Sequence, residues 1–233
     1  MLPSPAVKTR DMPEAELLVG GLTPFATIDF PGHLAAVVFC QGCPWRCACC
    51  HNERLRACGS GERSWADVRA WLTSRRGILD GVVFSGGEPL LQHGLIQALG
   101  EVRALGFATG LHTAGIYPGR LAAALPLLDW VGFDIKGPFE DYRRLTGDGS
   151  GEAAARSLSL LRAAGTAHEI RCTVDPDLLD ADAIRRMARQ LAAREVSRLV
   201  LQACRRDGQP VPLPPALLAA AAAVLPGVTV RNG

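Results

Sequence analysis

Residues 35–52 read AAVVFCQGCPWRCACCHN, an apolar run that passes directly into a segment crowded with cysteines. The run from Ala35 is rich in β-branched residues, which is typical of a buried strand. Five of the eight cysteines of the chain lie between Cys40 and Cys50, in a segment that also contains the turn formers Gly42 and Pro44. A group of thiols this dense, directly after a strand, indicates a metal or cofactor site.

Cys43, Cys47 and Cys50 are separated by three and by two residues. A [4Fe–4S] cube takes a thiolate at each iron, so three cysteines at this spacing can hold one cube and leave one iron open. Because neighbouring cysteines cannot readily both face one cube, we expect Cys49 to be a packed thiol and Cys40 a core residue. The alternative is a zinc site, which would need four closed ligands and could recruit Cys40, Cys49, His51 or Cys58.

Short apolar runs alternate with segments of helical periodicity along the rest of the chain. The runs predict parallel strands at 35–39, 81–84, 107–111, 130–135, 168–174 and 198–203. The periodic segments predict helices at 64–75, 90–105, 118–125, 151–163 and 181–193. Ser64 and Asp67 form a capping pair at the first helix.

This alternation predicts an α/β fold of about six β/α units, either a doubly wound sheet or a partial TIM-type barrel. In both cases ligands bind at the carboxyl ends of the strands. We expect a single domain with an N-terminal extension (1–20), a core (21–203) and a closing segment (204–233). The closing segment should contain a helix at 214–224 and a short strand at 228–230.

The composition argues against several classes of partner. The formal net charge is only +2, which does not suggest a surface for nucleic acid. The first residues lack the apolar run of a signal peptide, and no later stretch reaches the length of a membrane span. We therefore expect a cytoplasmic protein, in which clustered cysteines more often bind metal than form disulfides.

Polar motifs follow three further predicted strands. After the second strand comes Ser85-Gly86-Gly87-Glu88-Pro89, in which Gly86 and Gly87 allow close approach of a ligand and Glu88 offers an acceptor for an ammonium group. The strand at 130–135 ends in Asp134-Ile135-Lys136, which places two opposite charges on one side of the backbone. Arg171, on the strand at 168–174, has a planar guanidinium suited to a carboxylate. A structural ion pair is the alternative for Arg171, and His112 and His33 are expected to be structural.

The segment 21–52 resembles the start of radical S-adenosylmethionine (SAM) activating enzymes. Within that superfamily it most resembles the anaerobic ribonucleoside-triphosphate reductase activating proteins. The residues that carry the resemblance are Thr23-Pro24-Phe25, Ile28-Asp29-Phe30-Pro31-Gly32, Phe39, Gln41-Gly42-Cys43 and Cys50-His51-Asn52.

The resemblance implies a radical SAM core in which Cys43, Cys47 and Cys50 hold a [4Fe–4S] cluster. It places SAM against Gly86, Gly87 and Glu88, near Asp134 and Lys136 as candidate catalytic residues, and near Arg171. The chain departs from the family at Cys49, where an aromatic residue is usual. It departs again at residues 112–115, where His-Thr-Ala-Gly replaces the Asp-Thr-Asn-Gly of many activating enzymes.

By this resemblance, the protein cleaves SAM reductively to a 5′-deoxyadenosyl radical and generates a glycyl radical on an anaerobic ribonucleoside-triphosphate reductase. A reduced flavodoxin or ferredoxin is the implied electron donor. Three alternatives stay open: an activase of another glycyl radical enzyme such as pyruvate formate-lyase, a small-molecule enzyme of the 7-carboxy-7-deazaguanine synthase type, or a noncatalytic zinc-binding module.

Overall fold

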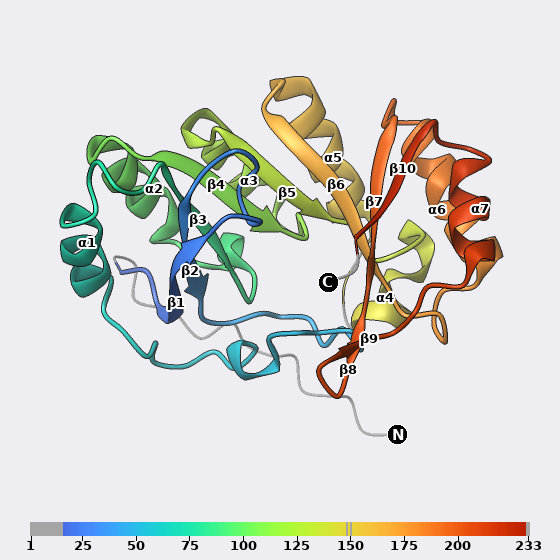
Figure 1. Cartoon of the computed structure of the whole chain (residues 1–233), viewed down its shortest axis with the longest axis horizontal. Helices are drawn as coiled ribbons and strands as arrows, with labels where there is room; N and C mark the ends of the chain where they lie inside the picture. Colours follow the sequence, from blue (N-terminus) through green and yellow to red (C-terminus); the bar gives the residue numbers. More distant parts are fainter. Residues whose placement is uncertain (1–15, 148, 150, 232–233) are drawn as a thin grey trace.

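The apolar runs form an eight-stranded sheet in the order β1-β2-β3-β4-β5-β6-β7-β10 (Figure 1). The computed structural model describes residues 16–147, 149 and 151–231. From β2 to β10 neighbouring strands pair in parallel, which confirms the predicted α/β class. The strands are β1 (Val19–Ala26), β2 (Ala35–Cys40), β3 (Gly81–Gly86), β4 (Ala108–Thr113), β5 (Trp130–Asp134), β6 (Ala167–Val174), β7 (Arg198–Ala203) and β10 (Gly227–Arg231).

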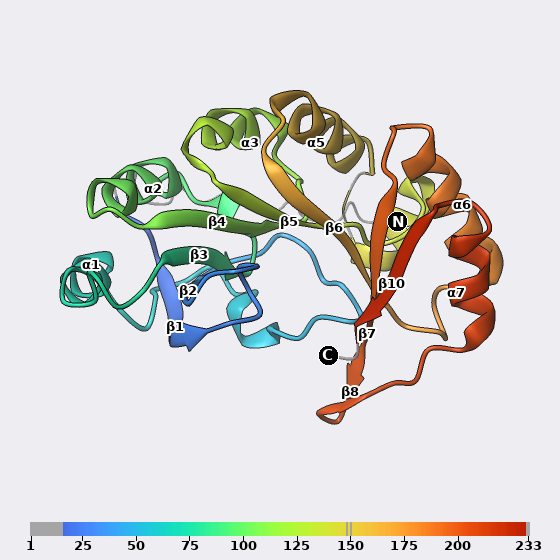
Figure 2. The same ribbon diagram turned by 45° about the horizontal axis from the view of Figure 1, so that its top comes forward.

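Helices connect these strands and lie along the convex side of the curved sheet, as a partial TIM-type barrel requires (Figure 2). Ser64 caps the first helix as predicted, because its hydroxyl accepts a hydrogen bond of 3.1 Å from the Asp67 amide. The α-helices are α1 (Trp65–Thr73), α2 (Leu95–Ala104), α3 (Pro118–Ala124), α4 (Tyr142–Thr146), α5 (Gly151–Ala164), α6 (Ala181–Ala192) and α7 (Pro215–Ala222). Among the described residues, no helix is both long and apolar enough to cross a membrane.

Side chains alternate between the two faces of the sheet and divide the core into two parts. On β3, Val82 and Phe84 join the large core beneath the helices, whereas Val83 points to the concave face. There it meets Val37 and Trp130 in a smaller apolar cluster. The same alternation places the polar residues near the ends of β3, β4, β5 and β6 on the concave side.

One strand of the eight-stranded sheet was not expected. β1 pairs antiparallel with β2 and forms the edge of the sheet, although its sequence VGGLTPFA contains two glycines and a proline, which are weak strand formers. Leu17 and Val19 are buried, so the end of the segment expected to be an extension enters the core. Residues 1–15 of that segment lie outside the described residues.

The connection between β1 and β2, here called the strap (residues 27–34), turns back onto the concave face. Its Phe30 is only 2% exposed and stacks on His33 at 4.1 Å and on Trp130 at 5.8 Å between ring centroids. The exposed Ile28 lies on the same segment. The strap therefore fills the part of the partial barrel that lies near the amino ends of the strands.

The predicted helix 90–105 is two elements, η2 (Pro89–Leu91) and α2 (Leu95–Ala104). The helix breaks at Gln92, whose backbone is extended. The side-chain nitrogen of Gln92 donates hydrogen bonds to the carbonyls of Leu18 and Gln41 at 2.8 Å each. The closing segment also contains a small hairpin, β8 (Arg205–Arg206) and β9 (Gln209–Pro210), that the sequence did not predict. Its helix and last strand match the predictions.

Candidate active site

The cysteine loop leaves the carboxyl end of β2 and is fastened at several points. The Gly42 amide donates to the carbonyl of Leu55 at 2.7 Å, and the Arg46 amide donates to the carbonyl of Thr146 at 2.7 Å. The loop is thereby tied both to the segment that follows it and to α4. These backbone bonds hold the thiols near the carboxyl ends of the strands.

The three predicted cluster ligands lie in an environment that suits thiolate-bound iron. Cys43 and Cys47 pack against an apolar cluster that contains Trp45 and Tyr142, whose rings meet edge to face at 5.6 Å. Burial raises the pKa of Cys43 to about 12 and also raises that of Cys47, and the neighbouring thiols, Cys50 among them, raise both further. The thiols of Cys43 and Cys47 lie close together and stay protonated in the absence of metal. Iron can displace their protons and bind them as thiolates.

A single metal ion would need a tighter arrangement. Within residues 16–147, 149 and 151–231, no set of three or more His, Cys, Asp or Glu side chains is arranged to hold one metal ion. A cube carries its thiolates on separate irons, so its ligands stand further apart than those of one zinc ion. Cys43, Cys47 and Cys50 are the residues that would hold such a cube here.

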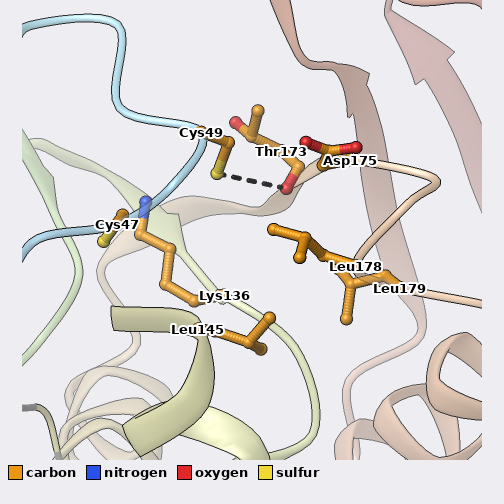
Figure 3. A pocket seen from close by; sticks show the side chains of 8 residues that line it. All are labelled: Cys47, Cys49, Lys136, Leu145, Thr173, Asp175, Leu178 and Leu179. Carbon is orange, nitrogen blue, oxygen red and sulfur yellow. Dashed lines mark hydrogen bonds between the residues drawn. The ribbon is translucent and has the colours of Figure 1, made fainter. Parts of the chain in front are cut away.

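The other cysteines differ from these three in burial and contacts. All eight are free, Cys40 and Cys172 are fully buried, and Cys58 is exposed. Cys49 turns away toward β6, where its thiol points at the carbonyl of Thr173 at 4.0 Å (Figure 3). Cys40 and Cys49 are thus core and packed thiols, as expected from the sequence.

Gly86 and Gly87 are required by the cysteine loop itself. Gly86 has a φ of +112°, and a Cβ there would lie 2.5 Å from the Cys40 nitrogen. A Cβ on Gly87 would lie 2.1 Å from the Gly42 carbonyl oxygen. The sequence predicted close approach of a ligand, and the structure shows close approach of the neighbouring backbone, which sets the end of β3 directly beneath the cysteine loop.

Glu88 is turned into the protein and only 2% exposed. Its carboxylate accepts hydrogen bonds from the Leu90 amide at 3.1 Å, the Thr113 hydroxyl at 2.6 Å and the Ala114 amide at 2.9 Å. Burial raises the pKa of Glu88, and these three donors oppose that rise. The side chain therefore ties the loop after β3 to the end of β4, a role for Thr113 and Ala114 that the sequence did not reveal.

Asp134, Lys136 and Arg171 form one row at the ends of β5 and β6. The Arg171 Nε donates to the Asp134 carboxylate, whose other oxygen lies 3.7 Å from the Lys136 ammonium. Burial would raise the pKa of Asp134, but the charges of Arg171 and Lys136 outweigh it and hold that pKa below its ordinary value. Gly132 leaves room for the Arg171 guanidinium, since a Cβ at position 132 would lie 2.8 Å from the Arg171 Nη1. Arg171 is thus a buried partner of Asp134.

A small pocket opens between this row and the cysteine loop (Figure 3). The Lys136 ammonium reaches toward Cys47, and its charge favours the thiolate form of that residue. Leucines form the opposite wall. The pocket is lined by Cys47, Cys49, Lys136, Leu145, Thr173, Asp175, Leu178 and Leu179. Its cavity volume of about 10 Å³ is room for one water molecule, so these residues form one edge of the site and do not enclose a whole ligand.

His112 should make the protein lose stability in mild acid. Burial, reinforced by the charge of Arg171, lowers the pKa of its imidazole to about 3. Below about pH 6.5, His112 is protonated in the unfolded chain but stays neutral in the folded protein. The free energy of unfolding therefore falls as the pH falls from about 6.5 toward 3. At pH 5.5 the loss should be about 1.4 kcal/mol. For a chain of this size, that loss lowers Tm by about 3–5 °C.

Anaerobic calorimetry at pH 7.5 and pH 5.5 measures this effect. His112→Gln, which does not titrate, should lack that part of the decrease in Tm. Equal decreases in the two proteins would show that His112 does not cause it.

The chain matches the family model described as the radical SAM superfamily over residues 37–190. It is 28% identical over 180 residues to a glycyl-radical enzyme activating enzyme of Methanocaldococcus jannaschii, covering 74% of each chain. It is 34% identical over 169 residues to a pyruvate formate-lyase-activating enzyme of Clostridium pasteurianum, covering 69% of this chain and 70% of the relative.

The fold is also similar to a solved domain of a pyruvate formate-lyase-activating enzyme from Bacteroides vulgatus. The TM-score is 0.54 at 19% identity, over 65% of this chain and 99% of that domain. Radical SAM enzymes use a [4Fe–4S] cluster and SAM, and the thiol set and the polar row described above fit those groups. The chain belongs to the radical SAM superfamily and, within it, to the glycyl-radical-enzyme activating enzymes.

Proposed function

We propose that this protein activates an anaerobic ribonucleoside-triphosphate reductase by generating a glycyl radical on it. The observation that carries the proposal is the convergence of Cys43, Cys47 and Cys50 with the Asp134–Lys136 row at one edge of the sheet. The similarity of residues 21–52 to activating proteins of that reductase supports the choice of partner.

A cluster held by Cys43, Cys47 and Cys50 would supply the electron for reductive cleavage of SAM at the bond between sulfur and C5′, which gives methionine. The net reaction would move one hydrogen atom from a glycine of the partner to the 5′-deoxyadenosyl group, giving 5′-deoxyadenosine and a glycyl radical on the partner. A reduced flavodoxin or ferredoxin restores the electron.

The residues of this chain hold and orient the reactants. Cys43, Cys47 and Cys50 would hold the cluster through three thiolates, which would leave one iron free to bind SAM. The Lys136 ammonium, held by Asp134, offers a donor to the SAM carboxylate at the edge of the pocket. Burial of Glu88 and Arg171 keeps the loop after β3 and the Asp134 carboxylate in fixed positions.

A pyruvate formate-lyase is the second candidate partner, since the Clostridium pasteurianum relative activates that class of enzyme and is 34% identical to this chain. Both partners belong to one class of protein substrate. The geometry described here is compatible with either.

The deciding experiment mixes reduced, cluster-loaded protein and SAM with each candidate partner without oxygen. We expect 5′-deoxyadenosine and a glycyl radical EPR doublet on the reductase, and none on pyruvate formate-lyase. A doublet on pyruvate formate-lyase alone would favour the second partner. Absence of 5′-deoxyadenosine in every mixture would contradict the proposed function.

A further inference from the structure

His112 contacts three parts of the molecule that lie far apart in the sequence. It lies on β4, points to the concave face and is 9% exposed, with its ring edge against Trp130 at 5.6 Å between centroids. Its Nε2 lies 2.9 Å from the Asp29 carbonyl oxygen of the strap, and its Nδ1 lies 3.2 Å from the Ser85 hydroxyl. Ser85 directly precedes the two glycines beneath the cysteine loop.

These two contacts determine which ring nitrogen carries the proton. A carbonyl oxygen can only accept, so Nε2 must donate to Asp29. In the uncharged ring Nδ1 is then an acceptor, and the Ser85 hydroxyl donates to it. Both nitrogens of an uncharged imidazole are therefore used, one by the strap and one by β3.

The third neighbour is Arg171, whose Nη1 lies 3.5 Å from His112 Nε2. That distance is long for a hydrogen bond, and Nε2 already has its proton directed at Asp29. The strong contact of the guanidinium is with Asp134, which in turn faces Lys136. Because an uncharged ring at position 112 does not attract the Arg171 guanidinium, Arg171 pairs with Asp134.

An aspartate at position 112 would act differently from the histidine. A carboxylate there could not donate to the Asp29 carbonyl, and the two oxygens would repel each other. Its charge would also attract Arg171 and compete with Asp134 for it. The identity of this residue therefore affects both the strap and the Asp134–Lys136 row.

We propose that His112 is a positioning residue for SAM binding, which fixes the strap and Ser85 to the sheet through its two ring nitrogens and leaves the Arg171 guanidinium to Asp134. The inference rests on the proposed function, because it takes the row at the ends of β5 and β6 as the place that receives SAM. His112 itself acts through Ser85, Asp29 and Arg171.

The test compares His112→Asp with His112→Gln, which keeps one N–H for the Asp29 carbonyl and one oxygen for Ser85. Cluster content is measured first, and the Kd for SAM is then measured by anaerobic calorimetry on cluster-loaded protein. We expect His112→Asp to raise the Kd at least ~tenfold, which corresponds to about 1.4 kcal/mol. His112→Gln should stay within ~threefold of the wild type, less than the loss of one ordinary hydrogen bond.

Hydrogen exchange at the amides of the strap gives a second readout. Exchange should accelerate in His112→Asp and remain slow in His112→Gln, because only the first loses the bond to Asp29. A purely structural role would lower Tm or cluster content without a selective change in SAM affinity.

The proposal is wrong if His112→Asp binds SAM within twofold of the wild type at equal cluster content, or if His112→Gln is as weak as His112→Asp. Should His112→Asp fail to hold the cluster, Ser85→Ala decides, since it removes only one hydroxyl. An unchanged Kd for SAM in Ser85→Ala would then overturn the proposal, and a raised Kd at equal cluster content would support it. Failure of the proposed function has a different signature, namely a wild-type protein that binds SAM without cleaving it.

Discussion

Cys47→Ser is expected to abolish SAM cleavage. A [4Fe–4S] cube held by three thiolates loses its attachment at one iron when one is removed, and Cys47 is the central member of the three in the chain. The amount of 5′-deoxyadenosine formed should fall by at least ~10³-fold, to the background of the uncatalysed reaction. Iron and acid-labile sulfide per chain, measured after anaerobic reconstitution, should fall with it.

Cys58→Ser and Cys49→Ser are the matched controls. Cys58 is an exposed thiol shortly after the loop, and Cys49 belongs to the loop but points to the Thr173 carbonyl. Both variants should keep iron and sulfide, and Cys58→Ser should also keep SAM cleavage. If Cys47→Ser retains a full cluster while Cys49→Ser or Cys58→Ser loses it, the ligand assignment is incorrect.

Gly87→Ala should produce the largest loss of stability among single-methyl additions in the site. The new Cβ would lie 2.1 Å from the Gly42 carbonyl oxygen. Because that oxygen belongs to the backbone and cannot rotate away, the cysteine loop must shift. Overpacking of this kind costs ~3 kcal/mol or more. For a chain of this size, that cost should lower Tm by roughly 6–12 °C. Scanning calorimetry under anaerobic conditions checks it.

Gly100→Ala is the control with the same chemical change. Gly100 lies in α2, and a Cβ there meets nothing within 4 Å. Replacing a helical glycine by alanine should stabilise the protein by about 0.5–1 kcal/mol. A Gly87→Ala protein with the Tm of the wild type would mean that the loop after β3 is not pressed against the cysteine loop.

Much of the fold could be predicted because its parallel strands are buried on both faces and therefore read as continuous apolar runs. The run from Ala35 to Phe39 was found in this way. β1 was missed because its glycines and proline hide a strand that depends on pairing with β2. The break at Gln92 was missed because it depends on hydrogen bonds to Leu18 and Gln41, which are distant in sequence.

The candidate site also has residues that the sequence predicts and contacts that it does not. Spacing predicts Cys43, Cys47 and Cys50 as the cluster ligands, because a cluster constrains the intervals between its ligands. The partners of Glu88 and Arg171 could not be predicted, since each pairs across strands with a residue that local sequence does not reveal. His112 was expected to be structural, and its two ring contacts join segments 83 and 27 residues away in the chain.

The fastenings of the cysteine loop also bear on the order in which the protein is made. The loop is complete once residue 52 has been synthesised, yet Arg46 is held by Thr146, Cys49 by Thr173 and His51 by the amide of Arg205. A ribosome therefore releases the thiols long before it releases the segments that hold them in place. During that interval the thiols are open to oxidants and stray metal ions, so iron and sulfide delivery is best timed to follow completion of the chain.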